Sequence, residues 1–236
     1  MHESVKQKEN TNTEHPSNKY DFIFSLGEAC FSAGFLRKHK LREFSAPFDW
    51  MYGSTFENRV KMLINRFEGW LELKDLIFSG QRENPEPCDI YTNKKTNLVF
   101  NHDFALNTKL EDTFAEVKEK YDRRINRLLD YLNNADNKIL IVYMTLPNST
   151  SNPTGNEQIT ELVQELNKSF NATIDLVYIE HEENYKDCEF TVKSLGNHVK
   201  KVKLFNRDRE IAETFTGNIK NFTYLLNNTK IFTPMD

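Results

Sequence analysis

A cysteine at the point where a predicted strand passes into a predicted helix is the first feature of this sequence that could do chemistry. The stretch "YDFIFSLGEACFSAGFLRKH", residues 20–39, starts as a strand, passes through Ser-Leu-Gly and continues with a helical pattern. Cys30 lies in the first turn of that helix. The positive end of a helix dipole favours the thiolate, which is the reactive form of cysteine. Alternatively, Cys30 is a small buried residue packed beside Ala33.

Two other residues offer related chemistry. Ser25 ends the first predicted strand, where SGNH-type esterases and acyl-hydrolases keep a nucleophilic serine. Those enzymes also need Asp-x-x-His near the carboxyl terminus, and "NNTKIFTPMD" contains none. His102 lies beside Asp103 at the end of the predicted strand "NLVFNHDF", 97–104, and is a better functional candidate than the other histidines.

The spacing of apolar residues predicts the elements that must position these side chains. Strands are expected at 20–25, 97–104, 138–144, 173–179 and 198–205, and helices at 28–38, 54–67, 113–132, 159–166 and 219–227. This alternation favours an α/β fold, with a mainly parallel sheet flanked by helices in a Rossmann- or flavodoxin-like order. We expect residues 1–18 to be a disordered polar lead and 19–236 to form a single domain. Ligands bind such sheets beyond the carboxyl ends of the strands. The loops "SLGEAC", "NHDF" and "TLPNST" should therefore share one edge.

Composition narrows the range of partners. The net charge is −4 and the basic residues are dispersed, so nucleic acid or an anionic membrane is not the expected partner. No apolar run approaches the roughly 18 residues of a membrane span, and the first residues lack the apolar core of a secretory signal. We therefore expect a cytoplasmic protein. The 3 cysteines form no CxxC pair and no Gly-rich phosphate loop occurs, so neither a metal site nor a cofactor is expected.

Several separated motifs together resemble the DUF1796 family, which is labelled as papain-like cysteine peptidases. They are "SLGEACFSAGFLRKHKLREFSAPFDW", then "FNHDF", then the helix "KYDRRINRLLDYL" and the strand "KILIVYM". The resemblance covers roughly residues 20 to 145. True papain-type enzymes place the cysteine on a helix and the histidine on an antiparallel barrel-like sheet. The predicted β-α alternation instead indicates a doubly wound sheet.

The resemblance implies a role for each matching residue. Cys30 would be the nucleophile, His102 the general base, and Asp103 or Asp49 the group that orients the histidine. Backbone N–H groups of residues 27–30 would stabilise an oxyanion. A carboxylate at Glu28 would oppose thiolate formation if it faced Cys30.

The remaining candidates concern the substrate, which we expect to be a small molecule, a peptide or a glycan. Ser25, Gly27 and Glu28 line the first loop, Trp50 belongs to an aromatic loop, and Arg124 lies on the long helix. The leading hypothesis is a cysteine-nucleophile hydrolase or acyltransferase. The alternatives are a transferase of surface-polysaccharide assembly, an SGNH-like esterase using Ser25, and a non-catalytic domain. The oligomeric state stays open.

Overall fold

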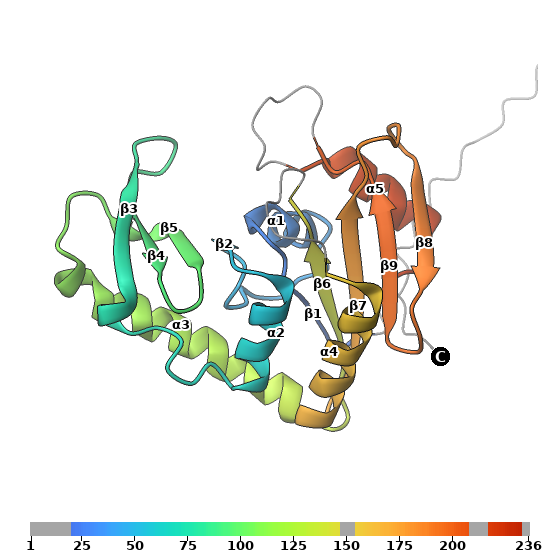
Figure 1. Cartoon of the computed structure of the whole chain (residues 1–236), viewed down its shortest axis with the longest axis horizontal. Helices are drawn as coiled ribbons and strands as arrows, with labels where there is room; N and C mark the ends of the chain where they lie inside the picture. Colours follow the sequence, from blue (N-terminus) through green and yellow to red (C-terminus); the bar gives the residue numbers. More distant parts are fainter. Residues whose placement is uncertain (1–19, 147–153, 208–216, 233–236) are drawn as a thin grey trace, which may run out of the picture.

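Two β-sheets of different kinds form the framework of the molecule (Figure 1). The computed structural model describes residues 20–146, 154–207 and 217–232. One sheet has 5 strands in the order β1-β6-β7-β9-β8, and the other has 4 strands in the order β2-β5-β4-β3. The expected polar lead and most of the "TLPNST" loop lie outside the described residues.

The 5-stranded sheet is mixed but mostly parallel. Strands β1 (Phe22–Ser25), β6 (Lys138–Met144), β7 (Thr173–His181) and β9 (Val199–Leu204) run parallel, and β8 (Phe190–Ser194) is an antiparallel edge. The inner strand β6 reads "KILIVYM" and is buried from its second residue onward, as expected for a strand covered on both faces. The α/β class and the mainly parallel sheet are thus confirmed.

Helices cover both faces of this sheet (Figure 1). Phe22 and Phe24 of β1 belong to one buried cluster, whereas Ile23 belongs to another, because successive side chains of a strand point to opposite faces. The helices of the described residues are α1 (Cys30–Lys38), α2 (Phe56–Ile64), α3 (Leu110–Asn133), α4 (Asn156–Ser169) and α5 (Ile219–Asn228), with a 3₁₀ turn at Leu73–Asp75. None of these helices is long and apolar enough to cross a membrane.

The 4-stranded sheet is antiparallel, and it includes a strand that was expected in the parallel sheet. It contains β2 (Met51–Gly53), β3 (Leu76–Arg82), β4 (Cys88–Asn93) and β5 (Leu98–Ala105). The predicted strand 97–104 is β5, so its assignment to the parallel sheet was wrong. A short turn joins β4 to β5 as a hairpin, and antiparallel neighbours need no crossover helix. Strand β1 instead pairs directly with β6.

The long helix α3 connects the two sheets. Tyr121, in its first half, packs edge-on against Trp70 and Phe100 beside the antiparallel sheet. Tyr131, near its end, packs against Phe22 of the parallel sheet. Both groups belong to one continuous buried cluster, so the sheets share a core.

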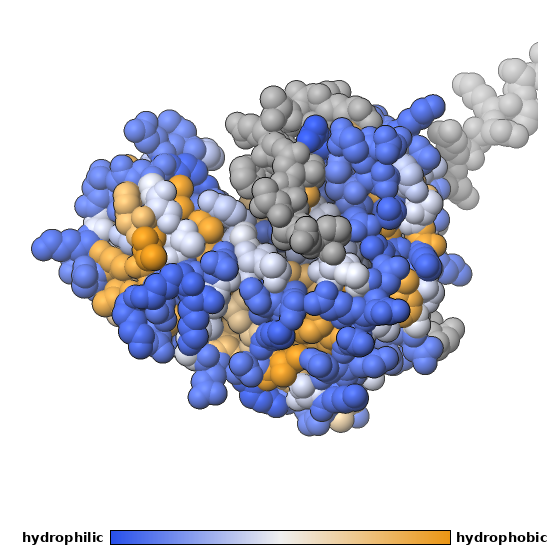
Figure 2. Space-filling model, in the orientation of Figure 1, coloured by the Kyte–Doolittle hydropathy of each residue, from blue (hydrophilic) through white to orange (hydrophobic). Residues whose placement is uncertain are grey.

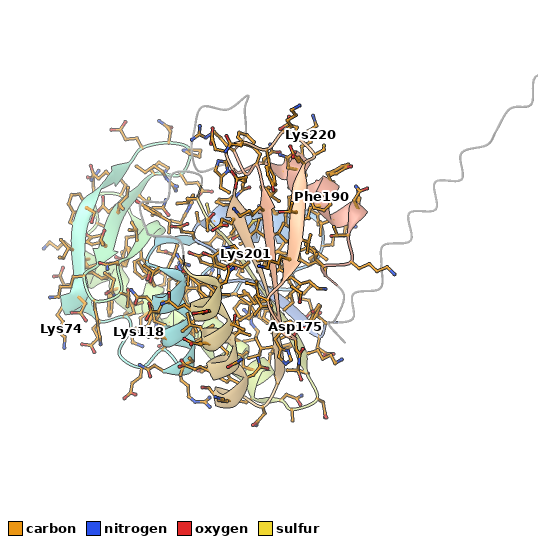
Figure 3. All side chains as sticks on the ribbon, turned by 45° about the vertical axis from the view of Figure 1, so that its right-hand side comes forward. Lys74, Lys118, Asp175, Phe190, Lys201 and Lys220 are labelled. Carbon is orange, nitrogen blue, oxygen red and sulfur yellow. The ribbon has the colours of Figure 1, made fainter. Side chains whose placement is uncertain are left out.

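The surface of the molecule is uneven in polarity. The face in Figure 2 is largely hydrophilic, with apolar side chains at the left, over the antiparallel sheet, and in smaller groups at the lower centre and right. In Figure 3, Asp175 lies low, near the amino end of the parallel strands, whereas Lys220 lies at the top. Because α1 follows the carboxyl end of β1, Cys30 lies at the edge opposite Asp175.

Candidate functional site

Helix α1 begins at Cys30 and places its thiol at the helix amino terminus. No side chain caps this helix end, where Ala29 is the N-cap residue. Burial raises the pKa of the Cys30 thiol; its own backbone N–H and the charge of Arg82 act in the opposite direction, and Glu86 adds to the rise. The expected activation by the helix terminus is therefore outweighed by desolvation. The thiol is protonated at neutral pH and needs a base to react.

A buried arginine, which the sequence analysis missed, holds the loop before Cys30. The side chain of Arg59, in α2, is fully buried. It donates hydrogen bonds to the carbonyls of Leu26 (3.2 Å), Gly27 (3.0 Å) and Glu28 (3.3 Å), and it also bonds to the carbonyl of Gly53 at 2.6 Å. Burial lowers the pKa of Arg59 to about 10, so the guanidinium stays charged at neutral pH.

Ser25 and Gly27 lie inside the protein. The Ser25 hydroxyl is 2.5 Å from that of Ser32 and accepts a hydrogen bond from Gly27 N–H at 3.1 Å. A Cβ at Gly27 would collide with the Ser32 side chain, so this position requires glycine. Ser25 is 0% exposed, which leaves it no access to a substrate, and we do not propose a serine esterase.

Two backbone N–H groups of the loop between β1 and α1 already donate hydrogen bonds within the protein. Gly27 N–H donates to Ser25 and Glu28 N–H donates to the carbonyl of Met144 at 3.1 Å. The Glu28 carboxylate accepts from the N–H of Leu146 at 2.7 Å and so fastens the loop to the end of β6. Any oxyanion site must therefore use N–H groups from residue 29 onward rather than the expected range 27–30.

His102, on β5, lies among charged and aromatic side chains. Its Nδ1 is 3.1 Å from Glu86 Oε2 and 3.2 Å from Arg82 Nη2. The Trp50 ring contacts the imidazole edge-on, with 5.8 Å between the ring centroids. Arg82 also donates to the backbone carbonyl of Glu86 at 2.9 Å, which closes the β3–β4 hairpin beside His102.

Asp103 does not orient His102. It accepts hydrogen bonds from Lys120 at 2.5 Å and from the hydroxyl of Tyr121 at 2.9 Å, both in α3. Adjacent residues of a strand point to opposite faces, so a His-Asp dipeptide in a strand cannot form such a pair. Glu86, between β3 and β4, contacts His102 Nδ1 instead.

Asp49 reaches the site indirectly. Its carboxylate is 0% exposed, forms an ion pair with Arg42 and accepts from Ala46 N–H at 3.0 Å. Burial raises its pKa to about 6, against the opposing charge of Arg42. Arg42 in turn lies over Trp50, 5.8 Å from the ring centroid. Asp49 thus supports the indole that contacts His102.

Arg124, in α3, lies close to Tyr121 and Asp49. Its guanidinium is 5.3 Å from the Tyr121 ring centroid, and its charge lowers the pKa of Asp49. Asp49 Oδ1 and Arg124 Nη1 are buried without a hydrogen-bond partner in the described structure. The described interactions of Arg124 therefore join it to Tyr121 and to the buried carboxylate of Asp49, and not to Cys30 or His102.

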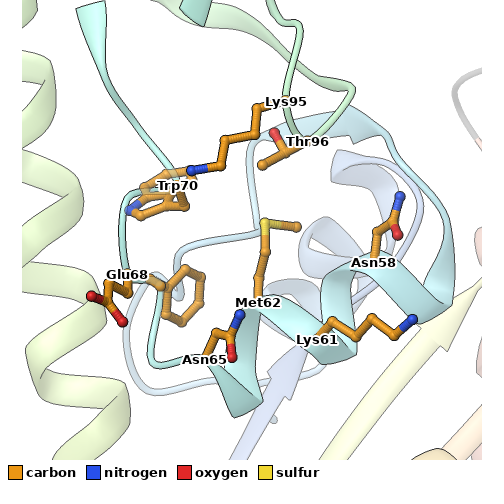
Figure 4. A pocket seen from close by; sticks show the side chains of 9 residues that line it. Asn58, Lys61, Met62, Asn65, Glu68, Trp70, Lys95 and Thr96 are labelled. Atoms are coloured by element: carbon orange, nitrogen blue, oxygen red, sulfur yellow. The ribbon is translucent and has the colours of Figure 1, made fainter.

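A separate cavity lies between α2 and the β4–β5 turn (Figure 4). Its volume is 170 Å³, and Met62, Trp70, Lys61 and Lys95 are among its lining residues. It contains neither a cysteine nor a histidine, and its volume is below the roughly 300 Å³ of ordinary ligand pockets. Across the described residues, no three His, Cys, Asp or Glu side chains gather as metal ligands.

Comparisons with known proteins agree with the motifs. Residues 21–184 match the family model described as "Putative papain-like cysteine peptidase (DUF1796)". The "Uncharacterized protein R408" of Acanthamoeba polyphaga mimivirus is 27% identical over 185 residues, which cover 72% of this chain and 81% of the viral protein. No solved structure was found to match the chain.

Proposed function

The chain belongs to the DUF1796 family, and from this premise we propose that it is a cysteine-nucleophile hydrolase or acyltransferase. Cys30 is the nucleophile, His102 the general base and Glu86 the group that orients the base. This set keeps two of the residues chosen from the sequence and replaces Asp103 with Glu86.

The observation that carries the proposal is a pair of charges shared by the cysteine and the histidine. Arg82 and Glu86 both contact His102 Nδ1, and both act on the pKa of Cys30. Electrostatic influence falls off within about 10 Å, so this shared pair of charges supports the proposal that His102 acts on Cys30. Cys30 begins α1, which follows β1 of the parallel sheet, whereas His102 lies on β5 of the antiparallel sheet, more than seventy residues further along the chain.

The arrangement supports a two-step acyl transfer. In the tautomer that donates Nδ1–H to Glu86, the other ring nitrogen, Nε2, is free of a proton and can take the one from the Cys30 thiol. Arg82, which can only donate, then acts near Nδ1 as a charge and not as a hydrogen-bond donor to it. The sulfur attacks an acyl carbon, and N–H groups of the first turn of α1 face the developing oxyanion. Nε2 then returns the proton to the leaving group, and a thioester remains. Water or another acceptor attacks the thioester, which releases the acyl group and restores the thiol.

The resting state differs from an ion pair. Because burial raises the pKa of Cys30, the thiolate forms only as His102 removes the proton. Loss of His102 should therefore remove most of the reactivity, and not merely shift its pH dependence.

Alkylation by iodoacetamide tests this directly. We expect Cys30 in the folded wild type to react faster than buried Cys88, and His102→Ala to slow Cys30 alkylation at pH 7 by at least tenfold, in line with the contribution of a general base. Glu86→Gln should slow it less. Peptide mass spectrometry resolves the rate of each cysteine.

His198→Ala is the matched control. His198 also bonds a carboxylate, Asp175 at 2.8 Å, but it lies at the opposite edge of the sheet (Figure 3). This variant should leave Cys30 alkylation unchanged. A Cys30 that reacts only after unfolding, or equally fast without His102, would refute the proposal.

A further inference from the structure

One face of helix α1 joins the proposed nucleophile to a second polar group. Cys30, Gly34 and Arg37 are spaced i, i+4 and i+7, which places them on the same side of the helix. At a rise of 1.5 Å per residue, Cys30 and Arg37 lie about 10 Å apart along the axis. A Cβ added at Gly34 would meet no described atom within 4 Å, so the space between them is open.

Each end of this face lies near side chains that contact His102. The Arg37 guanidinium lies over the Trp50 ring, 5.6 Å from its centroid, and Trp50 contacts His102. At the other end, Cys30 is under the influence of Arg82 and Glu86, which hold His102. The open face of α1 therefore runs alongside the catalytic groups.

Arg37 is an exposed cation of this neighbourhood that forms no ion pair among the described residues. Arg42 is paired with Asp49, and Arg82 is paired with Glu86. Within the described part of the chain, Arg37 has no ion pair, and its guanidinium contacts the ring of Trp50. A guanidinium stacked on an indole is pre-oriented to bind a planar or tetrahedral anion with its remaining N–H groups.

We infer that the substrate is an acyl compound with an anionic group, a carboxylate or a phosphate, about 10 Å from the reacting carbonyl. The acyl carbon lies at Cys30, the chain crosses Gly34, and the anion binds Arg37 above Trp50. An extended peptide spans about 3.3–3.6 Å per residue, so a carboxylate two to three residues away would fit. This inference depends on the proposed function of Cys30.

Paired alkylating probes test the inference. Iodoacetyl-Gly-Gly carries a carboxylate near the required distance, and iodoacetyl-Gly-Gly amide is its neutral counterpart. In each case sulfur attacks the methylene, the carbon–iodine bond breaks, iodide leaves, and His102 takes the thiol proton. We expect the carboxylate probe to alkylate Cys30 roughly three- to fivefold faster than the amide, as for one partly screened charge pair. Iodoacetyl-aminobutyl phosphate, compared in the same assay, distinguishes a phosphate from a carboxylate preference.

Variants assign the preference to Arg37. The ratio of the two rates should fall to about one in Arg37→Gln, stay partly raised in Arg37→Lys, and keep its wild-type value in Lys38→Gln, which removes the same charge from the next residue of α1. High salt should reduce the ratio. A ratio of one in the wild type, or an unchanged ratio in Arg37→Gln, would overturn the inference while leaving the nucleophile intact. Absence of Cys30 alkylation by both probes would instead refute the nucleophile, and the inference with it.

Discussion

The two sheets supply the two halves of the candidate site in contrasting environments. The parallel sheet is covered on both faces, and the loop that leaves β1 is held by the buried Arg59. The antiparallel sheet has an exposed edge, β3, where Ile77 and Phe78 are more than half exposed. It carries His102, whose carboxylate partner Glu86 is itself largely exposed. The proposed nucleophile, Cys30, thus follows a buried and hydrogen-bonded loop, whereas the proposed base, His102, lies in a more solvated part of the molecule.

This contrast suggests that Cys30 and His102 are held in place by different kinds of interaction. The position of Cys30 depends on buried hydrogen bonds, whose loss is costly because the groups left behind stay desolvated. The position of His102 depends on contacts near the surface, which contribute little to stability. Substitutions near Cys30 should therefore alter folding, and those around His102 should alter reactivity alone.

Removal of the Arg59 side chain should have the largest effect. Arg59→Leu leaves the carbonyls of Leu26, Gly27, Glu28 and Gly53 without this buried donor, and we expect a loss of about 4 kcal/mol or more in the free energy of unfolding. Urea unfolding followed by circular dichroism measures it. Arg59→Lys keeps the charge but not the forked geometry and should lose less. Arg123→Leu, at an exposed arginine paired with Glu119, should change stability by less than about 0.5 kcal/mol. Equal losses of stability for Arg59→Leu and Arg123→Leu would contradict the role of Arg59 in holding the loop before Cys30.

The buried carboxylate of Asp49, just before β2, should make the stability of the protein depend on pH. Its folded pKa is about 6, raised by burial from the ordinary value of 3.8, so the folded state favours the protonated acid. The stability from this group is present below pH 4 and is lost as pH rises through 6, by roughly 3 kcal/mol in total. Asp49→Asn cannot ionise, so the stability difference between wild type and variant should shrink by this amount from pH 4 to pH 7.

Urea unfolding at several pH values gives that difference. Asp122→Asn serves as the control, because Asp122 is 46% exposed and, among the described residues, forms its ion pair with Lys118 on the same helix. A difference between wild type and Asp49→Asn that stays constant with pH would show that Asp49 ionises as freely in the folded as in the unfolded chain.

A pair of phenylalanines gives the most direct comparison of the sheets, and Phe78 in β3 should show the smallest effect. Phe24 in β1 is 0% exposed and Phe78 in β3 is 54% exposed. Phe24→Ala should cost about 3–5 kcal/mol, the usual range for a buried ring. Phe78→Ala should cost about 1 kcal/mol or less, since it loses mainly its edge contact with Tyr91. Similar costs for the two changes would mean that β3 is covered in solution.

Elements with a strong internal pattern were predictable from sequence. The apolar run 138–144 coincides with β6, and the stripe predicted for 113–132 lies within α3, Leu110–Asn133. The final helix, expected at 219–227, is α5, Ile219–Asn228. The strands β2, β3, β4 and β8 were missed. They are short or carry mixed polar residues, because much of their stability comes from pairing with a neighbour.

Amino-acid sequence alone identified the family and the α/β class, because helical spacing, apolar runs and motif order are local properties of the chain. It also supplied Cys30 and His102 as the residues on which the proposed function depends. It could not reveal that His102 belongs to a second sheet, that Asp103 faces away from it, or that Glu86 and Arg82 flank it. Strand pairing and the face to which each side chain points are set by partners distant in sequence. The pKa of Cys30 likewise depends on how far the folded chain excludes water from the thiol, which is a property of packing and not of the residues beside it.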